Sequence, residues 1–143
     1  MTTVNELLRY KGAEIVTIDP DATVYDALAL MSRRNIGALL VLEKDRLVGV
    51  FSERDYARKV ILQGRSSKTT AVREIMSERF TAVKPNTPVE ECMGIMTEKR
   101  IRHLPVLDGD KLIGVVSIGD VVRAIIDDRE FTIAQLERYI CCG

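Results

Sequence analysis

Apolar residues recur along the chain with two periods, one typical of helices and one typical of buried strands. From Val24 to Arg34 and from Val89 to Lys99, apolar residues return every three or four positions, which places them on one face of a helix. Thr23 stands directly before the first of these segments and can cap it. Ile36–Leu42 is apolar throughout, as in a strand covered on both faces, and Leu47–Phe51 returns after a polar turn of hairpin length.

The remaining segments continue this alternation of helices and strands. Gly12 is a natural stop for a first short helix, and Arg65–Thr70 contains no apolar residue, which predicts a linker between two halves. The further predicted helices cover Val4–Tyr10, Ser52–Gly64, Val72–Met76, Ser117–Ile126 and Thr132–Ile140, and the further predicted strands cover Glu14–Ile18, Phe80–Val83, Ile101–Leu107 and Leu112–Val116.

The second half of the chain repeats the first. Leu47–Asp55 reads LVGVFSERD and Leu112–Asp120 reads LIGVVSIGD, each an apolar run with a glycine, then a serine, then an aspartate three residues later. When these stretches are aligned, the match continues without a gap from Val16 to Arg58, and the predicted elements follow in the same order in both halves. Identical pairs include Pro20/Pro85, Val24/Val89, Met31/Met96, Leu39/Leu104, Gly49/Gly114, Ser52/Ser117 and Asp55/Asp120.

A duplication of this length indicates two copies of one supersecondary unit, each with an apolar face that it cannot bury alone. We therefore predict an α/β (α+β) fold of two β-α-β-β-α units, related by a pseudo-twofold axis and packed through their sheets, with short helices added at the N-terminus and the C-terminus. The predicted boundaries are 1–66 for the first unit with its N-terminal helix, 67–130 for the second unit, and 131–143 for a C-terminal helix and tail.

Composition and charge narrow the possible functions. The 143 residues include 21 basic and 21 acidic side chains, and this balance argues against a broad surface for nucleic acid. No apolar run approaches the roughly 20 residues of a membrane span, and the N-terminus has no apolar signal-peptide core. One histidine and three cysteines without metal-like spacing predict neither a metal cluster nor a disulfide framework, so we expect a reducing cytoplasm.

These features together resemble a known family. The β-α-β-β-α unit, the run RIRHLPV at Arg100–Val106 and the pattern G-h-h-S-x-x-D (h, apolar) in both copies resemble the CBS domain, named after cystathionine β-synthase. A tandem pair of such domains is called a Bateman module, and the resemblance covers the chain from about Leu7 to Asp127. It implies binding of adenosine-containing ligands such as AMP, ADP, ATP, S-adenosylmethionine or NAD(H), usually for regulation rather than catalysis.

The serine–aspartate pairs have two interpretations. Ser52 with Asp55, and Ser117 with Asp120, have the spacing of a capping box, in which both side chains satisfy backbone N–H groups at the start of a helix. The resemblance implies that the aspartates also bind ribose, because a carboxylate can accept both hydroxyls of a cis-diol. The interpretations are compatible, since the serine can cap the helix while the aspartate faces a ligand.

Basic residues stand at the start of a predicted apolar strand, where charge is costly unless it faces solvent or an anion. The resemblance implies phosphate binding there, with Arg102 and His103 best placed, and a solvated strand end is the alternative. The first copy lacks this charge, so we expect two chemically unequal clefts between the units. The residues that stand in the first copy at the positions of Arg100, Arg102, His103 and Pro105 are Asn35, Gly37, Ala38 and Leu40.

Two other positions are open to interpretation. Arg54 is either a phosphate contact or a solvated residue of the first helical turn, where its charge is unfavourable for the helix dipole. Thr17, which is matched by Ala82, is either an ordinary strand residue or a ligand contact. The candidate ligand-binding residues are therefore Thr17, Ile36, Gly37, Ala38, Ser52, Arg54, Asp55, Ala82, Arg102, His103, Pro105, Ser117 and Asp120.

No motif in the sequence indicates catalysis. Cys92 lies on the apolar face of a predicted helix, which favours a small buried residue over a nucleophile. His103 is the one candidate general base of its type, and the family resemblance explains it without catalysis. Neither a G-x-G-x-x-G motif nor a P-loop is present. We therefore expect that the protein is not an enzyme and that it has no catalytic cofactor.

The predicted function is a stand-alone sensor of adenine nucleotides, AMP, ADP, ATP or NAD(H), which bind between the two units. Such a sensor would signal through an unidentified effector protein or through self-association, with a homodimer expected. Two alternatives are a structural or interaction protein with vestigial clefts and a sensor of S-adenosylmethionine. An enzyme that acts on a nucleotide is a further alternative, which turnover by the purified protein would reveal.

Overall fold

The computed structural model describes residues 2–11 and 15–142. Contacts divide the chain into two compact units. The first consists of Ile15–Thr81 with Asp110–Leu112, and the second consists of the described parts of Met1–Glu14, Ala82–Gly109 and Ile113–Gly143. Each unit contains most of one sequence repeat and has a hydrophobic core of its own. The predicted mixed α/β fold of two similar units with small sheets is confirmed.

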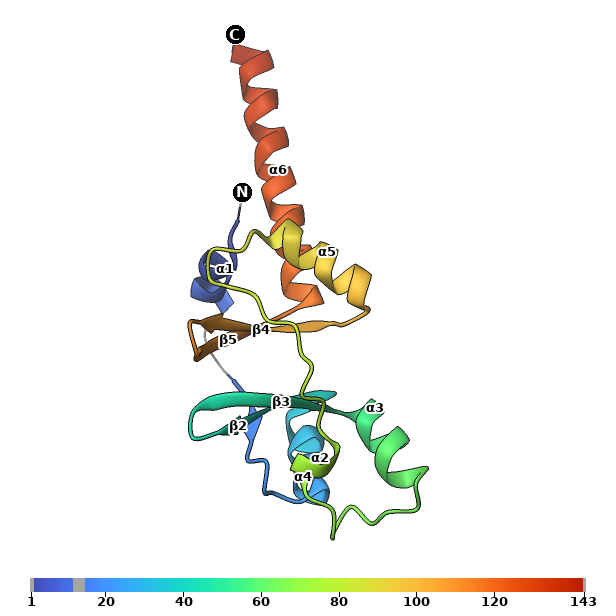
Figure 1. Ribbon diagram of the computed structural model, residues 1–143. Coiled ribbons are helices and arrows are strands. Elements are labelled where there is room, and N and C mark those ends of the chain that lie inside the picture. The colour runs from blue at the N-terminus through green and yellow to red at the C-terminus, as the bar shows by residue number, and fades with distance from the viewer. Residues whose placement is uncertain (1, 12–14, 143) are drawn as a thin grey trace. The chain divides into compact units, whose positions relative to one another are not determined.

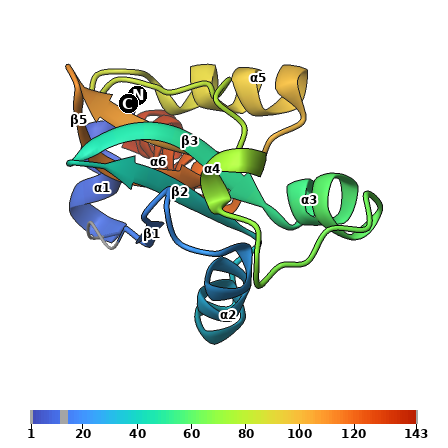
Figure 2. The same cartoon turned by 60° about the horizontal axis from the view of Figure 1, so that its bottom comes forward.

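The first unit contains a three-stranded sheet in the order β1-β2-β3 (Figure 2). β2 (Ala38–Glu43) and β3 (Arg46–Ser52) are antiparallel, and β1 (Thr17–Ile18) runs parallel to β2. Lys44 and Asp45, between β2 and β3, both have positive φ, as a tight hairpin turn requires. The predicted hairpin is therefore confirmed.

Both strands predicted at the start of a repeat are much shorter than expected. Of the strand predicted over Glu14–Ile18, only Thr17 and Ile18 form β1, while Glu14, like Gly12, lies outside the described residues. Phe80–Val83 forms no strand, and Val83 makes an isolated parallel bridge to Val106. In each segment the last residues are the ones that pair, Thr17 and Ile18 in the first repeat and Val83 in the second, so the shortening is on the N-terminal side.

The long helix of the first repeat, α2 (Val24–Arg34), has the predicted bounds. Thr23 Oγ1 accepts a hydrogen bond from the amide of Asp26 at 3.1 Å, which caps the helix, and Asn35 ends it with a left-handed φ of 53°. The apolar face of α2 is buried in the core of the first unit together with residues of β2 and β3. The fully buried residues of this core include Val24, Ala27, Leu39, Val41, Phe51 and Val60.

The prediction of one regular helix over Ser52–Gly64 is wrong, because the helical residues form two different kinds of turn. α3 (Glu53–Tyr56) is one short turn, and the chain continues as a π-helical turn, η1 (Ala57–Ile61). Here amides reach back five residues, since Leu62 N donates to the carbonyl of Ala57 at 3.1 Å. Val60 in this wider turn is fully buried, so the π turn keeps an apolar contact with the core.

In the second unit, α5 (Val89–Lys99) also has the predicted bounds. β4 (His103–Asp108) and β5 (Lys111–Ser117) form a two-stranded sheet, which confirms the second predicted hairpin. α5 and α6 cover the core of this unit, which contains Leu104, Val106 and Val116 from the strands. Each repeat therefore contains its own long helix, followed by its own hairpin, at matching positions.

Two short helices, α1 (Val4–Lys11) and α4 (Val72–Ile75), pack in a way that the sequence division does not show. α1 belongs to the second unit, where the amide of Val4 donates to the carbonyl of Thr87 at 2.9 Å. α4 packs in the same way in the first unit, where the amide of Val72 donates to the carbonyl of Ala22 at 2.9 Å. The predicted boundary at residue 66 grouped α1 with the first repeat, whereas its contacts lie with the second.

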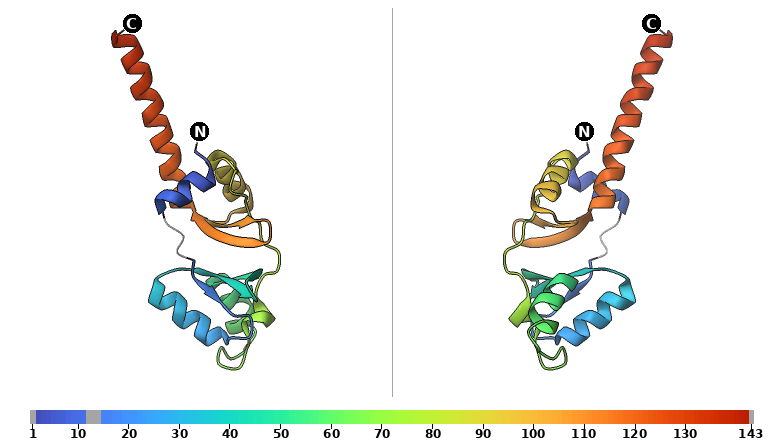
Figure 3. Two further views of the ribbon diagram at one scale, coloured as in Figure 1. Left: turned by 90° about the vertical axis from the view of Figure 1, so that its left-hand side faces the viewer. Right: turned by 90° about the vertical axis from the view of Figure 1, so that its right-hand side faces the viewer.

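The last helix, α6 (Ile118–Cys142), is 25 residues long (Figure 1). Thr132–Ile140 is helical as predicted, but it continues α6 and is not a separate helix, because the intervening residues contain neither glycine nor proline. Figure 3 shows α6 extending past α1 and α5 of the same unit. The amide and hydroxyl of Thr2 donate to the carboxylate of Asp128 at 3.1 and 2.6 Å, which fixes the N-terminal segment to α6.

Candidate ligand-binding site in each repeat

Each repeat begins its last helix with a capping box. The amide of Ser52 donates to Asp55 Oδ2 at 3.0 Å, and the amide of Asp55 donates to Ser52 Oγ at 3.2 Å. In the second repeat, Ser117 N lies 2.9 Å from Asp120 Oδ2, and Asp120 N lies 3.1 Å from Ser117 Oγ. The capping interpretation is therefore confirmed for both motifs, and both carboxylates are fixed at the start of a helix.

A second backbone contact is common to both repeats. The amide of Glu53 donates to the carbonyl of Gly37 at 3.1 Å, and the amide of Ile118 donates to the carbonyl of Arg102 at 2.8 Å. These bonds join the beginning of the last helix to the segment that enters the first hairpin strand. The structure thus brings the candidates near Gly37 together with the capping box of the first repeat, and those near Arg102 together with the capping box of the second.

The other candidates of the first repeat lie at its sheet and at α3. Ala38 pairs with Ser52 between β2 and β3, and Ile36 is half-buried just before β2. Thr17 is half-buried in β1 and pairs with Leu40, so it takes the place of an ordinary strand residue. Arg54 is exposed on α3.

The other candidates of the second repeat differ in their exposure. Arg102 and His103 are exposed at the beginning of β4. Ala82 is half-buried, whereas Pro105 is buried and its carbonyl accepts a hydrogen bond from the amide of Val83 at 3.0 Å. Pro105 thus belongs to the packed interior of the unit, whereas the carbonyl of Arg102 is bonded to the amide of Ile118 at the beginning of α6.

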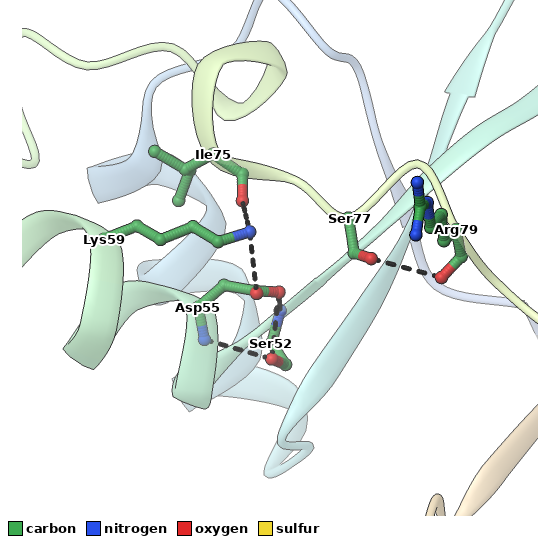
Figure 4. Close-up of polar contacts among 6 residues, drawn as sticks. All are labelled: Ser52, Asp55, Lys59, Ile75, Ser77 and Arg79. Atoms are coloured by element: carbon green, nitrogen blue, oxygen red, sulfur yellow. Dashed lines mark hydrogen bonds and ion pairs between the residues drawn. The ribbon is translucent and has the colours of Figure 1, made fainter. Parts of the chain in front are cut away.

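Lys59 is a site residue that the sequence analysis missed. Its Nζ lies 3.3 Å from Asp55 Oδ1 and donates to the carbonyl of Ile75 at 3.0 Å (Figure 4). The spacing of Asp55 and Lys59, four residues apart in a predicted helix, is the sequence signal that could have revealed the ion pair. The position matched to Lys59 in the second repeat is Ala124.

A pocket of about 410 Å³ lies in the first unit beside the predicted site. Ile36 and Gly37, two of the predicted candidates, line it together with the acidic side chain of Glu53. Sequence reasoning missed Glu53 because it concentrated on the serine and the aspartate of the same motif. The remaining lining residues come from α2 and its end, namely Leu28, Met31, Ser32 and Asn35.

A pocket of about 560 Å³ lies in the second unit, on the segment that precedes α5 and at the end of β4. Of the predicted candidates, only Ala82 lines it. Lys84 and Asn86, which the sequence analysis did not select, add a cation and an amide there. The two units thus present different polar groups in their pockets.

The thiol of Cys92 and the side chains that can ligate metals are the groups that a reactive centre would use. Cys92 is fully buried, and burial raises the pKa of its thiol to about 11, so the thiol stays protonated near neutral pH. Within the described ranges, no group of three or more histidine, cysteine, aspartate and glutamate side chains could hold a metal ion. Over the same ranges, no helix combines the length and the apolar character needed to cross a membrane.

The fold and the sites together define a class of protein with two similar α/β repeats, each of which fixes a carboxylate at the start of its last helix. The CBS domain matches residues 4–61 and 72–127. The chain therefore belongs to the CBS domain family, and it is a tandem CBS domain pair, or Bateman module. The family prediction from the motifs is confirmed.

Known proteins resemble the chain over most of its length. It is 43% identical to the CBS domain-containing protein CBSX3, mitochondrial, of Arabidopsis thaliana, over 99% of this chain and 73% of that protein. A structure from Burkholderia ambifaria MC40-6, a CBS-domain protein provisionally assigned to signal transduction, is 52% identical with a TM-score of 0.81, over 89% of this chain and 96% of that one. Both relatives are named as CBS-domain proteins.

A third relative is assembled from several copies. A hexameric CBS-CP12 protein from bloom-forming cyanobacteria is 30% identical with a TM-score of 0.71, over 99% of this chain and 83% of that one. The name of that protein also includes CP12. Its hexameric assembly is a property of that protein.

Proposed function

We propose that this Bateman module is a regulatory protein that binds adenosine-containing ligands, such as AMP, ADP, ATP or NAD(H), and binds their ribose through Asp55 and Asp120. One observation carries the proposal: the same arrangement occurs in both units, with a carboxylate fixed by a capping box beside the carbonyl of Gly37 or Arg102. A fixed carboxylate offers acceptors at a defined place, which suits the two neighbouring hydroxyls of a ribose.

Phosphate groups of the ligand are expected to be held differently in the two repeats. Arg102 and His103, both exposed at the beginning of β4, supply the second repeat with groups that favour an anion. In the first repeat, Gly37 and Ala38 stand at these positions, and the exposed Arg54 is the candidate cation. We therefore expect the second repeat to favour phosphorylated ligands more strongly.

A thermal-shift panel with AMP, ADP, ATP, NAD, NADH and S-adenosylmethionine tests this function. A ligand at 100 times its dissociation constant should stabilise the protein by about 2.7 kcal/mol. The double variant Asp55→Ala with Asp120→Ala should lose the shift, whereas Asp127→Ala, which removes an exposed carboxylate of α6, should keep it. Absence of a shift with every ligand would contradict the proposal and favour an interaction protein with vestigial sites.

α6 favours self-association as the route of output. Its apolar residues Ile126, Ile133, Leu136 and Ile140 are 48, 55, 57 and 78% exposed. Together with Val122 and Arg129 they recur at alternating steps of four and three residues, which is the seam of a coiled coil. Arg129 is the one charged residue of this seam, and Glu130 directly follows it. In a parallel pair of helices, Glu130 of one chain would lie beside Arg129 of the other chain. The seam is therefore self-complementary, and we infer a homodimer.

Light scattering after size exclusion measures this association. Ile133→Glu with Leu136→Glu should convert the dimer into a monomer, because two charges would enter the apolar seam of each helix. Ala134→Glu is the matched control, since residue 134 occupies an outer position of the heptad, away from the seam. A monomeric parent protein, or a dimer that survives the double substitution, would contradict the assignment and leave an effector protein as the partner of α6.

The expected location in a reducing cytoplasm is also a proposal. It is based on the absence of a disulfide framework in the sequence and on the buried free thiol of Cys92. The Arabidopsis relative has a mitochondrial location in its name, which concerns that protein. Fractionation of cells with an antibody against the chain decides between these compartments.

A further inference from the structure

Contacts within the first unit occupy most of the carboxylate of Asp55 (Figure 4). Oδ2 accepts hydrogen bonds from the amide and from the hydroxyl of Ser52, both at 3.0 Å, and Oδ1 faces the ammonium of Lys59 at 3.3 Å. A carboxylate has about four acceptor sites, so these three contacts leave about one. A cis-diol that donates two hydrogen bonds therefore needs one more acceptor site than Asp55 offers while Lys59 stays in place.

Lys59 also connects Asp55 to another element. Its Nζ donates to the carbonyl of Ile75, the last residue of α4, at 3.0 Å. Lys59 lies within the π-helical turn η1, a rare geometry that is common at functional positions. The same ammonium thus contacts the candidate ribose-binding carboxylate and the end of α4.

The second repeat has no such ammonium at the matching position. Ala124 stands there, and its methyl group carries no charge. A competitor for the ribose-binding aspartate is therefore built into the first repeat at a position where the second repeat has alanine.

We propose that Lys59 is a positioning residue that competes with the ligand for Asp55. The first repeat then binds a cis-diol with both hydroxyls only after the ammonium leaves Oδ1, and this movement also releases the carbonyl of Ile75. The proposal rests on the proposed function, because it takes Asp55 to be a ribose contact. It also predicts that ligand binding in the first repeat changes the end of α4.

The released carbonyl precedes two amides that hold the end of α4 in place. Met76 N donates to the carbonyl of Val72, and Ser77 N donates to the carbonyl of Val50 on β3, both at 2.9 Å. Loss of the lysine contact at Ile75 weakens the last turn of α4, so these amides should open more often. Occupation of the first repeat is thus transmitted to the segment that leaves the first unit.

Calorimetric titration with adenosine tests the competition, because adenosine has the diol but no phosphate. All proteins carry Asp120→Ala, so that the first repeat is observed separately. Lys59→Met should bind adenosine about 1.4- to 2.3-fold more tightly than the parent, which corresponds to the strength of an ion pair at this helical spacing. Lys59→Arg should keep the parent affinity, and Arg58→Met, which removes a neighbouring exposed charge, should also leave it unchanged.

Unchanged or weaker adenosine binding by Lys59→Met would overturn the competition. If the parent binds no adenosine but Lys59→Met does, the competition is supported in its strongest form. Failure of the proposed function has a different appearance, since no adenosine-containing ligand would then bind the unsubstituted protein.

Hydrogen exchange at Met76 and Ser77 tests the connection to α4 independently of affinity. Lys59→Met should accelerate exchange of the Met76 amide about twofold even without ligand, and Lys59→Arg should restore it. Saturating adenosine should accelerate the same amide in the Asp120→Ala parent and cause no further change in Lys59→Met. Binding of adenosine to the parent without any change at these two amides would overturn the proposed release of Ile75.

Discussion

In the first repeat, the helix that begins after Ser52 ends after one turn and widens into η1, whereas the helix that begins after Ser117 continues for 25 residues. The capping boxes of the two helices have nevertheless almost the same distances, and both helices join the hairpin through the same backbone bond. The position of the aspartate is therefore fixed locally, by the cap and the junction, and does not depend on the length or regularity of the helix.

The side chains around this common frame have diverged. The first repeat has Gly37 and Ala38 at the strand entrance and Lys59 against the aspartate, while the second has Arg102 and His103 at the entrance and Ala124 in place of the lysine. A duplicated backbone thus supports two sites with different charge. Under the proposed function, the two repeats would share ribose binding and would differ in the other ligand groups that they accept.

Alanine at the two matched glycines should have the largest effect on stability, and the effect should be unequal. A Cβ at Gly49 would lie 2.7 Å from Met76 Sδ and 3.0 Å from the backbone oxygen of Ser77, whereas a Cβ at Gly114 would lie 2.7 Å from the end of the Leu8 side chain. A side chain can rotate more easily than a bridged backbone can move. We expect Gly49→Ala to lower the free energy of unfolding by about 1–3 kcal/mol and Gly114→Ala to cost less.

Urea unfolding followed by circular dichroism measures both glycine variants. A larger loss for Gly114→Ala, or no loss for either, would show that the short helices α1 and α4 do not depend on this close approach.

Removal of the caps should have a smaller effect that is similar in both repeats. Ser52→Ala and Ser117→Ala each lose the oxygen that accepts the amide of the aspartate, so each should cost about 1 kcal/mol. Denaturant unfolding of both variants, with Ser67→Ala in the linker as a control, provides the comparison. A loss confined to one repeat would contradict the common frame.

The smallest effect concerns pH and is confined to the second unit. The hydroxyl of Thr2, and after it the amide of Thr2, lower the pKa of Asp128 below its ordinary value. The contact therefore stabilises the folded protein above about pH 4, where the carboxylate of the unfolded chain is ionised, and is lost as the pH falls through the lower folded pKa. Because Asp128 is largely solvated, the contribution should be only about a few tenths of a kcal/mol.

Thermal unfolding of the parent protein and of Asp128→Asn between pH 3 and pH 6 measures this contribution. The difference between the two proteins should be present at pH 6 and should shrink toward pH 3. A difference that grows as the pH falls would have the wrong sign for a lowered pKa.

Local signals were sufficient to predict α2, α5 and both hairpins. Thr23 caps α2 by a single hydrogen bond, and the turn at Lys44 and Asp45 is a property of a few neighbouring residues. The pairing of Ser52 with Asp55, and its repetition in the second half, was visible for the same reason. Features that depend on three or four consecutive residues can be inferred from one sequence.

Features that depend on distant packing could not be inferred in this way. The packing of α1 with the second repeat is determined by contacts such as Leu8 against Gly114, which no local pattern reveals. The π turn of η1, in which Val60 is fully buried, was not marked by any local pattern either. Lys59 is an intermediate case, since its spacing from Asp55 was visible but its second contact, with Ile75, was not.

Calorimetric titration with AMP tests the central claim most directly, because it compares the two repeats within one protein. Asp55→Ala leaves the second repeat, which has Arg102 and His103 at its strand entrance and alanine at the position of Lys59, and Asp120→Ala leaves the first. We predict that Asp55→Ala binds AMP at least about threefold more tightly than Asp120→Ala, and that the double variant gives no binding heat. Equal affinities of the single variants, or undiminished binding by the double variant, would contradict the claim.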